Sequence, residues 1–194
     1  MKNREILAEQ LQTRSRDYLR RCHETLPSAE RHTIWTRLYA ASERLSMAVR
    51  ENNIAEAVIE IGSNLLGCEE MAIVQLHADT KLMTFLAAVG ISVRQRQALQ
   101  SQFSRVAAEI NRNQVRLVDK RIAGDEFLAG IGVRALVPLT QGQSAAGAIV
   151  FFNLLPQRKS FESGDRELLG LLSVYVGPSL FGLERVGVTT HEPS

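Results

Sequence analysis

The stretch Gly132 to Phe152 reads GVRALVPLTQGQSAAGAIVFF and is the part of the sequence around which the other predicted elements are arranged. Two apolar runs, Val133 to Thr140 and Ala145 to Phe152, flank the short polar segment Gln141-Gly142-Gln143. Gly142 can adopt a positive φ that other residues resist, so this segment suits a tight hairpin turn. Neither run alternates between apolar and polar residues, which indicates strands that are buried on both faces. The stretch therefore predicts a central β-hairpin.

Other strands are predicted upstream of this hairpin. Two short apolar runs, Met71 to His77 and Leu82 to Val89, flank the turn-forming residues Ala78-Asp79-Thr80-Lys81. A further short strand is expected at Val115 to Val118. Hairpins with helices between and around them predict an α+β fold, with an antiparallel sheet of about five to six strands.

Periodic apolar residues predict the helices. The expected ranges are 2–25, 29–50, 54–66, 92–99, 103–113 and 161–183, and the loop 119–130 has weak helical character around 125–128. Ser163 is expected to cap the last helix. Gly170, Gly177, Pro178 and Gly182 are expected to weaken its second half, with a kink or an end at Pro178.

Composition limits the class of protein. The 194 residues are 45% hydrophobic and 23% charged, which is typical of a folded soluble domain. Charges interrupt every apolar run, and the first residues have no apolar segment of a secretory signal, so we expect a cytoplasmic protein with no membrane partner. A net charge of +2 argues against nucleic-acid binding. We expect an N-terminal helical extension at 1–32, a domain at 33–185 and a disordered tail at 186–194.

Four segments in this order resemble the GAF domain family, over about Trp35 to Glu184. They are the helical stretch 38–66, the first hairpin LLGCEEMAIVQLHADTKLMTFLAAVG at 65–90, the central hairpin at 130–153, and SFESGDRELLGLLSVYVGPSL at 160–180. The resemblance implies that the N- and C-terminal helices pack together. It also implies a sensory or regulatory module of signal transduction that binds a small molecule or dimerises, usually without catalysis.

The specific chemistries of this family lack their residues here. Bilin-binding members attach the chromophore through a Cys in the stretch that corresponds to 119–132, which has none in this chain. Cys22 and Cys68 do not match the catalytic positions of the members that reduce free methionine sulfoxide, and the signature of the cyclic-nucleotide-binding members is present only in fragments. The four histidines are not spaced as metal ligands. We therefore predict no catalytic residue, no metal and no cofactor.

The resemblance places any ligand pocket between the sheet and the helices 92–113 together with the loop 119–130. Candidate lining residues are Phe85, Phe103, Val106, Ile110, Phe127, Leu128 and Val137, and the alternative is that they simply fill the core. Arg134 lies in an otherwise apolar run, where an unpaired charge would be costly. It is expected to pair with Asp119 or Asp125, or to hold an anionic ligand.

Two functions remain open from the sequence. The first is a non-catalytic regulatory module that acts as a homodimer, with a helical bundle across the twofold axis formed by Leu38, Leu45, Leu168, Leu172 and Tyr175 and with residues 1–32 extending the bundle or docking a signalling protein. The alternative is a sensor of a nucleotide-like or other anionic small molecule. An enzyme such as a thiol-based reductase ranks third, since no motif supplies a nucleophile with its base.

Overall fold

The structure is a computed structural model that describes residues 2–25, 30–119 and 121–182. The predicted disordered tail and the end of the predicted last helix lie outside these residues. In chain order the elements are α1 (Lys2–Thr25), α2 (Arg31–Glu51), α3 (Ile54–Asn64), β1 (Cys68–His77), β2 (Leu82–Val89), α4 (Val93–Ser101), α5 (Phe103–Asn111), β3 (Arg116–Leu117), α6 (Glu126–Gly130), β4 (Ala135–Gln141), β5 (Ser144–Leu154) and α7 (Ser163–Phe181).

The predicted central hairpin is confirmed as β4 and β5. Its turn contains Gly142 at φ 64°, a conformation that other residues rarely adopt. The described strands form one antiparallel sheet in the order β2-β1-β5-β4-β3, so β5 pairs with both β1 and β4. The sheet and its flanking helices make an α+β fold, as the sequence predicted.

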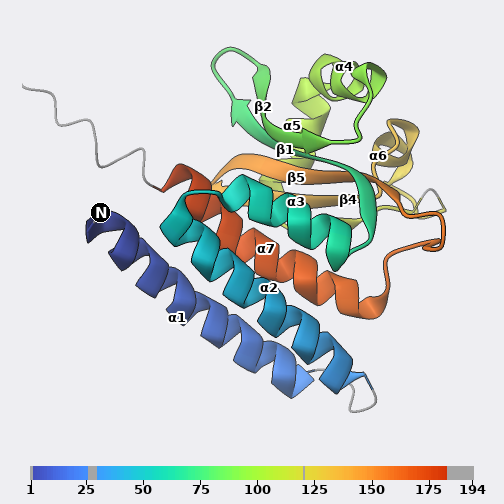
Figure 1. The fold of residues 1–194 in the computed structure, drawn as a ribbon. Coiled ribbons are helices and arrows are strands. Elements are labelled where there is room, and N and C mark those ends of the chain that lie inside the picture. Colours follow the sequence, from blue (N-terminus) through green and yellow to red (C-terminus); the bar gives the residue numbers. More distant parts are fainter. Residues whose placement is uncertain (1, 26–29, 120, 183–194) are drawn as a thin grey trace, which may run out of the picture.

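Helices cover both faces of the sheet (Figure 1). The first face carries α1, α2, α3 and α7, and the second carries α4, α5 and α6. Successive residues of β5 divide between the two sides, because Ile149 and Phe151 join the first core while Val150 and Phe152 join the second. Burial on both faces explains why the run is apolar throughout.

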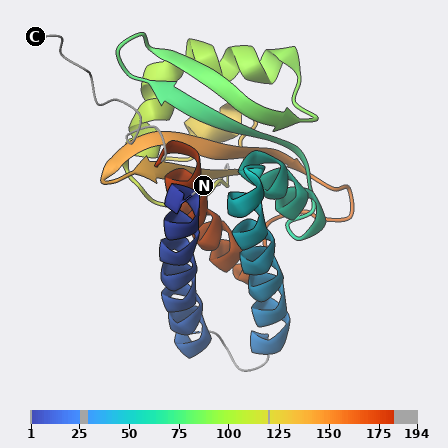
Figure 2. The same ribbon diagram turned by 60° about the vertical axis from the view of Figure 1, so that its left-hand side comes forward.

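Helices α1, α2 and α7 form a bundle beneath the sheet, and Figure 2 shows α1 and α2 as an antiparallel pair that projects from it. The hydroxyls of Ser15 and Ser42 lie 2.7 Å apart inside the α1–α2 interface. The hydroxyl of Tyr18 donates a hydrogen bond of 2.9 Å to the backbone carbonyl of Glu167 on α7. The predicted packing of the N- and C-terminal helices is therefore present within one chain.

The glycines of α7 mark where other elements approach it closely. A Cβ at Gly170 would lie 2.0 Å from the hydroxyl oxygen of Tyr18, and one at Gly177 would lie 2.5 Å from the backbone oxygen of Thr140. The helix continues through Pro178 to Phe181, so of the two predicted alternatives at this proline, a kink or an end, the end is wrong. These glycines give α7 room to cross its neighbours.

The N-cap of α7 also differs from the prediction. Glu162, and not Ser163, occupies this position, with a capping box formed with Asp165. The backbone N–H of Glu162 donates 2.7 Å to the Asp165 carboxylate. Because Asp165 lies in the first turn, its negative charge also faces the positive end of the helix.

Candidate functional site

The region predicted as a ligand pocket is packed with side chains. Val106, Ile110 and Leu128 are buried in the core between α5, α6 and the sheet. Phe85, Phe103 and Phe127 are partly buried against the same core. The guanidinium carbon of Arg96 lies 4.8 Å from the ring centre of Phe85, and that of Arg105 lies 4.0 Å from that of Phe127, so cations cover both rings. In this conformation these residues fill the core, which was the alternative interpretation of the sequence.

Val137 does not belong with this group. It pairs with Ile149 in the sheet, and both side chains join the core on the α7 side. Its neighbour Leu136 belongs to the core on the side of α5 and α6. The sequence could not assign the face because both faces of β4 are buried, so the run has no alternation to read.

The residues predicted to form a dimer interface are buried inside one chain. Leu38, Leu45, Leu168, Leu172 and Tyr175 are each at most 1% exposed. They pack in the core formed by α2, α3, α7, the sheet and α1. A homodimer of this conformation must therefore use other residues, and the predicted set is corrected to an intramolecular core.

Arg134 lies at a different site from the one predicted. It directly precedes β4, and its side chain is exposed, so the expected cost of burying an unpaired charge does not arise. The residue borders a cavity of about 610 Å³ at the β3 edge of the sheet. The cavity lies among β3, the segment after it, the end of β5 and the start of α7, and is lined by Leu117, Val118, Asp119, Arg121, Ile122, Arg134, Leu154, Lys159, Ser160, Phe161 and Arg166.

Positive charge dominates this cavity, which we call the basic cavity. The carboxylates expected to pair with Arg134 have other partners, because Asp125 binds Arg116 at 2.5 Å and Asp119 binds Arg121 at 2.6 Å. Within the part of the chain that the structure describes, Arg134, Lys159 and Arg166 have no carboxylate partner. Arg134 directly precedes β4, Lys159 lies between β5 and α7, and Arg166 belongs to α7; apolar side chains also line the cavity.

Asp125 organises one wall of the basic cavity. The carboxylate is 2% exposed and accepts hydrogen bonds from the Arg116 guanidinium and from the backbone N–H of Asp119, the latter at 2.9 Å. Arg116 also donates to Glu109 on α5 at 3.0 Å. The segment after β3 is thereby fixed to α5 and α6. Asp125 therefore positions the wall, and acid–base chemistry has no support from this geometry.

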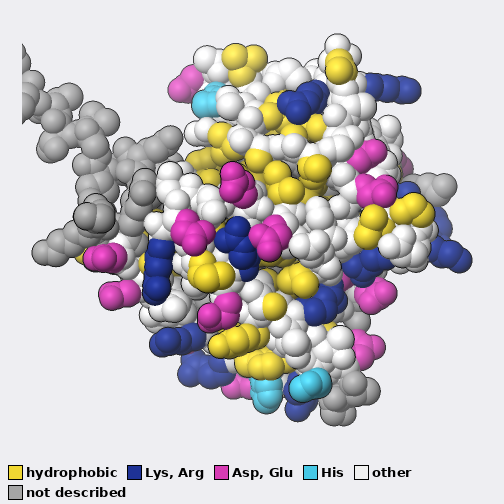
Figure 3. All heavy atoms as spheres, viewed as in Figure 1, with side chains coloured by type: hydrophobic (Ala, Val, Ile, Leu, Met, Phe, Trp, Pro, Cys, Tyr) yellow, Lys and Arg dark blue, Asp and Glu magenta, His cyan; other side chains and the backbone are white. Residues whose placement is uncertain are grey.

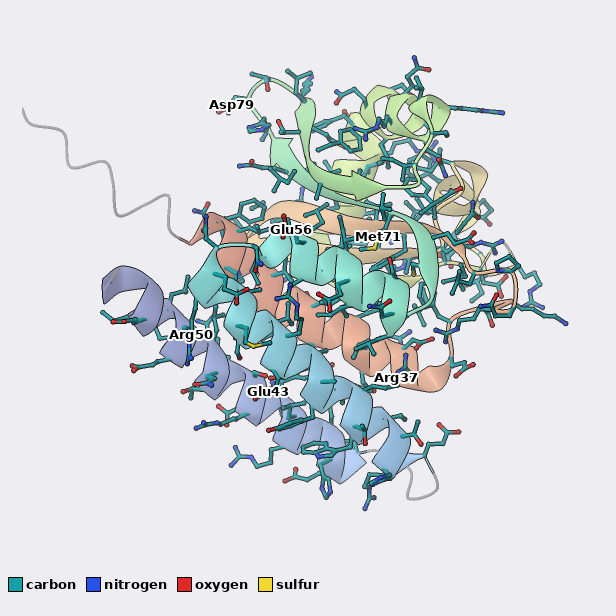
Figure 4. The ribbon with its side chains drawn as sticks, in the orientation of Figure 1. Arg37, Glu43, Arg50, Glu56, Met71 and Asp79 are labelled. Atoms are coloured by element: carbon teal, nitrogen blue, oxygen red, sulfur yellow. The ribbon has the colours of Figure 1, made fainter. Side chains whose placement is uncertain are left out.

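A second buried carboxylate, Asp165, holds the start of α7, the helix that contributes Arg166 to the lining of the basic cavity. Asp165 is fully buried, and its two oxygens each accept 2.6 Å hydrogen bonds, from Arg37 of α2 and from Arg158. Figure 4 shows Arg37 beside the N-terminal end of α7. Arg37 also donates to the carbonyl of Leu65 at 2.5 Å, and Arg158 to that of Leu66 at 2.6 Å. We call these residues the Asp165 cluster; it joins α2, the end of α3 and the segment before α7.

The two thiols are poorly suited to nucleophilic chemistry. Cys22 and Cys68 are both buried, and neither forms a disulfide. Burial raises the pKa of Cys22 to about 11 and that of Cys68 to about 12, so both are protonated at neutral pH.

Across the described ranges, no group of three His, Cys, Asp or Glu side chains is arranged to hold a metal ion. None of the helices described here is long and apolar enough to span a membrane.

Sequence reasoning identified Arg134 but missed Lys159 and Arg166 as members of the same site. All three are exposed cations, and Lys159 and Arg166 lie at least 25 residues from Arg134 in a chain with 23 Lys and Arg residues. The sequence marked them only by their position near the predicted start of the last helix, because helix N-termini favour the binding of anions. That signal becomes specific only when the antiparallel sheet brings the start of β4 beside the end of β5.

Comparison with known proteins identifies the fold. No family model matches the sequence, and no curated protein matches it. Among solved structures, residues 122 to 287 of a methyl-accepting chemotaxis protein match with a TM-score of 0.51 and 15% identity, over 76% of this chain and 99% of that one. The photoproduct state of GAF3 from Slr1393 of Synechocystis sp. PCC6803 matches with a TM-score of 0.50 and 18% identity, over 70% of this chain and 96% of that one. The chain therefore has a GAF-like fold, which confirms the resemblance seen in the sequence.

Proposed function

We propose that this chain is a non-catalytic sensory domain of signal transduction whose input is an anionic small molecule bound in the basic cavity. The observation that carries the proposal is the convergence of Arg134, Lys159 and Arg166 on one cavity without carboxylate partners. The GAF-like fold, and the chemotaxis protein among its structural neighbours, support the assignment to signalling.

The lining of the basic cavity favours a ligand that combines negative charge with an apolar body. Three unpaired cations favour more than one negative charge, because each can form a charge-assisted hydrogen bond. Leu117, Val118, Leu154 and Phe161 add apolar surface beside them. A nucleotide-like anion has both features, and a volume of about 610 Å³ lies within the usual range of small-molecule pockets.

Binding of ADP tests this proposal, with ADP as a probe that carries two phosphates and a flat base. We expect Arg134→Ala to weaken ADP binding by about tenfold or more, since a hydrogen bond to a charged group contributes about 1.5–3 kcal/mol. Isothermal titration calorimetry measures the affinity. The matched control is Arg94→Ala, which removes an exposed arginine from α4, an element outside the cavity lining.

Two results of these titrations would contradict the proposal. If wild-type protein does not bind ADP at millimolar concentration, or if Arg94→Ala weakens binding as much as Arg134→Ala does, the basic cavity is not an ADP-type anion site. A matched ionic strength is required in all titrations, because exposed cations attract any anion weakly at low salt.

A second candidate function is a homodimeric interaction module. Tyr39 is 57% exposed and Met47 is 51% exposed, and they lie eight residues apart on the outer side of α2. Figure 3 shows apolar side chains that emerge among charges of both signs over α1 and α2. An interface that included this surface would replace the buried set predicted from the sequence.

For the homodimer we expect the double variant Tyr39→Glu with Met47→Glu to have half the mass of the wild type in light scattering at micromolar concentration, because facing carboxylates repel across a twofold axis. Leu82→Glu is the control, since Leu82 is 52% exposed on β2 at the edge of the sheet. A wild type that is already monomeric would exclude this candidate.

A further inference from the structure

Three consecutive residues at the start of α7 contact three different parts of the molecule. Successive residues of an α-helix are separated by about 100° around its axis, so neighbours in the sequence point in different directions. Asp165 binds Arg37 and Arg158, Arg166 lines the basic cavity, and Glu167 contacts Tyr18 of α1. Because the three residues are consecutive, a displacement of the backbone at one of them also displaces the other two.

Glu167 holds α1 through both its backbone and its side chain. Its carbonyl accepts the 2.9 Å hydrogen bond from the Tyr18 hydroxyl, and its carboxylate lies 3.4 Å from the Tyr18 oxygen and 3.4 Å from the Cys22 sulfur. Tyr18 reaches this position because Gly170, one turn later, has no side chain to block it. The docking of α1 at this point therefore requires the N-terminal end of α7, residues 163–167, to be folded.

Arg166 connects this turn to the basic cavity. Its two neighbours in the sequence are occupied by contacts inside the protein, whereas Arg166 is exposed and has no carboxylate partner among the described residues. An anion held jointly by Arg166, Lys159 and Arg134 would tie the first turn of α7 to the preceding segment and to the start of β4. Terminal helix turns open more readily than helix centres, so such a tie would lower the population of the open turn.

We propose that an anion in the basic cavity strengthens the docking of α1 through the N-terminal end of α7, residues 163–167. The inference rests on the proposed function, because it requires the cavity to bind an anion. The ligand stabilises every state in which residues 163–167 of α7 are helical, and the contact between Tyr18 and Glu167 exists only in those states. When the basic cavity is occupied, α1 therefore stays docked on α7 for a larger fraction of the time than when the cavity is empty. The cavity is the input and α1 is the element that responds.

Hydrogen exchange of the α1 amides tests this coupling, in wild-type protein with and without ADP at constant ionic strength. At ten times the Kd of ADP, we expect the α1 amides that exchange by undocking to slow by up to about tenfold. In Tyr18→Phe, which lacks the hydroxyl that reaches Glu167, the hydrogen-bonded amides near the N-terminal end of α7 should still slow while those of α1 respond much less. Arg94→Gln, with its substitution on α4, should behave like the wild type.

The possible outcomes separate the inference from the proposed function. ADP binding in calorimetry without slower exchange in α1 overturns the coupling and leaves the anion site intact. Equal slowing of α1 in the wild type and in Tyr18→Phe also overturns it, since the effect then does not pass through Glu167. No binding of ADP overturns both.

Discussion

Asp165→Asn is expected to lower the free energy of unfolding by about 3–5 kcal/mol, the usual effect of breaking a buried ion pair. Asp165 is fully buried, while the side chains of Arg37 and Arg158 are only 22% and 18% exposed. An asparagine keeps the shape but removes the charge, and its amide nitrogen faces a guanidinium that needs an acceptor. Arg37 would then remain largely buried without its carboxylate partner, and Arg158 would keep only the exposed carboxylate of Glu162, 3.8 Å away. Urea unfolding measures the loss, and the melting temperature should fall by about 10 °C.

Asp17→Asn is the matched control for this substitution. Asp17 pairs with Arg20 on the surface of α1, with side chains that are 58% and 73% exposed. An exposed pair of this kind contributes at most about 0.5–1 kcal/mol, so the control should unfold close to the wild type. If the two variants have the same stability, the Asp165 cluster does not hold α2, α3 and α7 together as described.

Gly177→Ala should destabilise the protein by about 2–3 kcal/mol, although alanine is the better helix former by about 1 kcal/mol. The added Cβ would lie 2.5 Å from the backbone oxygen of Thr140 and 2.6 Å from its backbone nitrogen. These are backbone atoms of β4, held by the pairing of Thr140 with Ala145 of β5, so they cannot move aside as the end of a flexible side chain can. Thermal and urea unfolding should both show the loss, and α7 must shift away from the sheet to relieve the contact.

Gly130→Ala separates this steric effect from helix propensity. Gly130 is the last residue of α6, and a Cβ there would meet no atom within 4 Å. We expect this variant to unfold within about 0.5 kcal/mol of the wild type or to be slightly more stable. A stabilising Gly177→Ala would show that the crossing of α7 over β4 is looser than in the structure.

The two predictions show different limits of sequence reasoning. Periodicity and turn residues located the central hairpin, the upstream hairpin and most helices, because these signals depend on neighbours in the chain. The same local reasoning treated Gly170 and Gly177 as weak points of a helix. Their function is to admit Tyr18 and β4, and both contacts join residues far apart in the sequence.

The candidate site shows the same division more sharply. Arg134 stood out because it interrupted an apolar run, but the reason given for its importance was wrong, since the strand begins one residue later and its side chain is exposed. Lys159 and Arg166 had no such mark. Cations on a surface look alike in a sequence, and only their arrangement around one cavity distinguishes these three.

The GAF-like α+β fold and the central hairpin could be predicted from the sequence, as could the lack of the thiol signatures of GAF domains, because each prediction depends on residue types at short spacing. Tertiary structure decided which face of β4 carries Val137, that the expected dimer residues form an intramolecular core, and that three distant cations meet in one cavity. In strands that are buried on both faces, apolar and polar residues do not alternate, so the sequence does not show which face of the sheet a given residue occupies. An apolar helix face looks the same whether it packs against its own chain or another copy, so only the folded chain shows which partner it has.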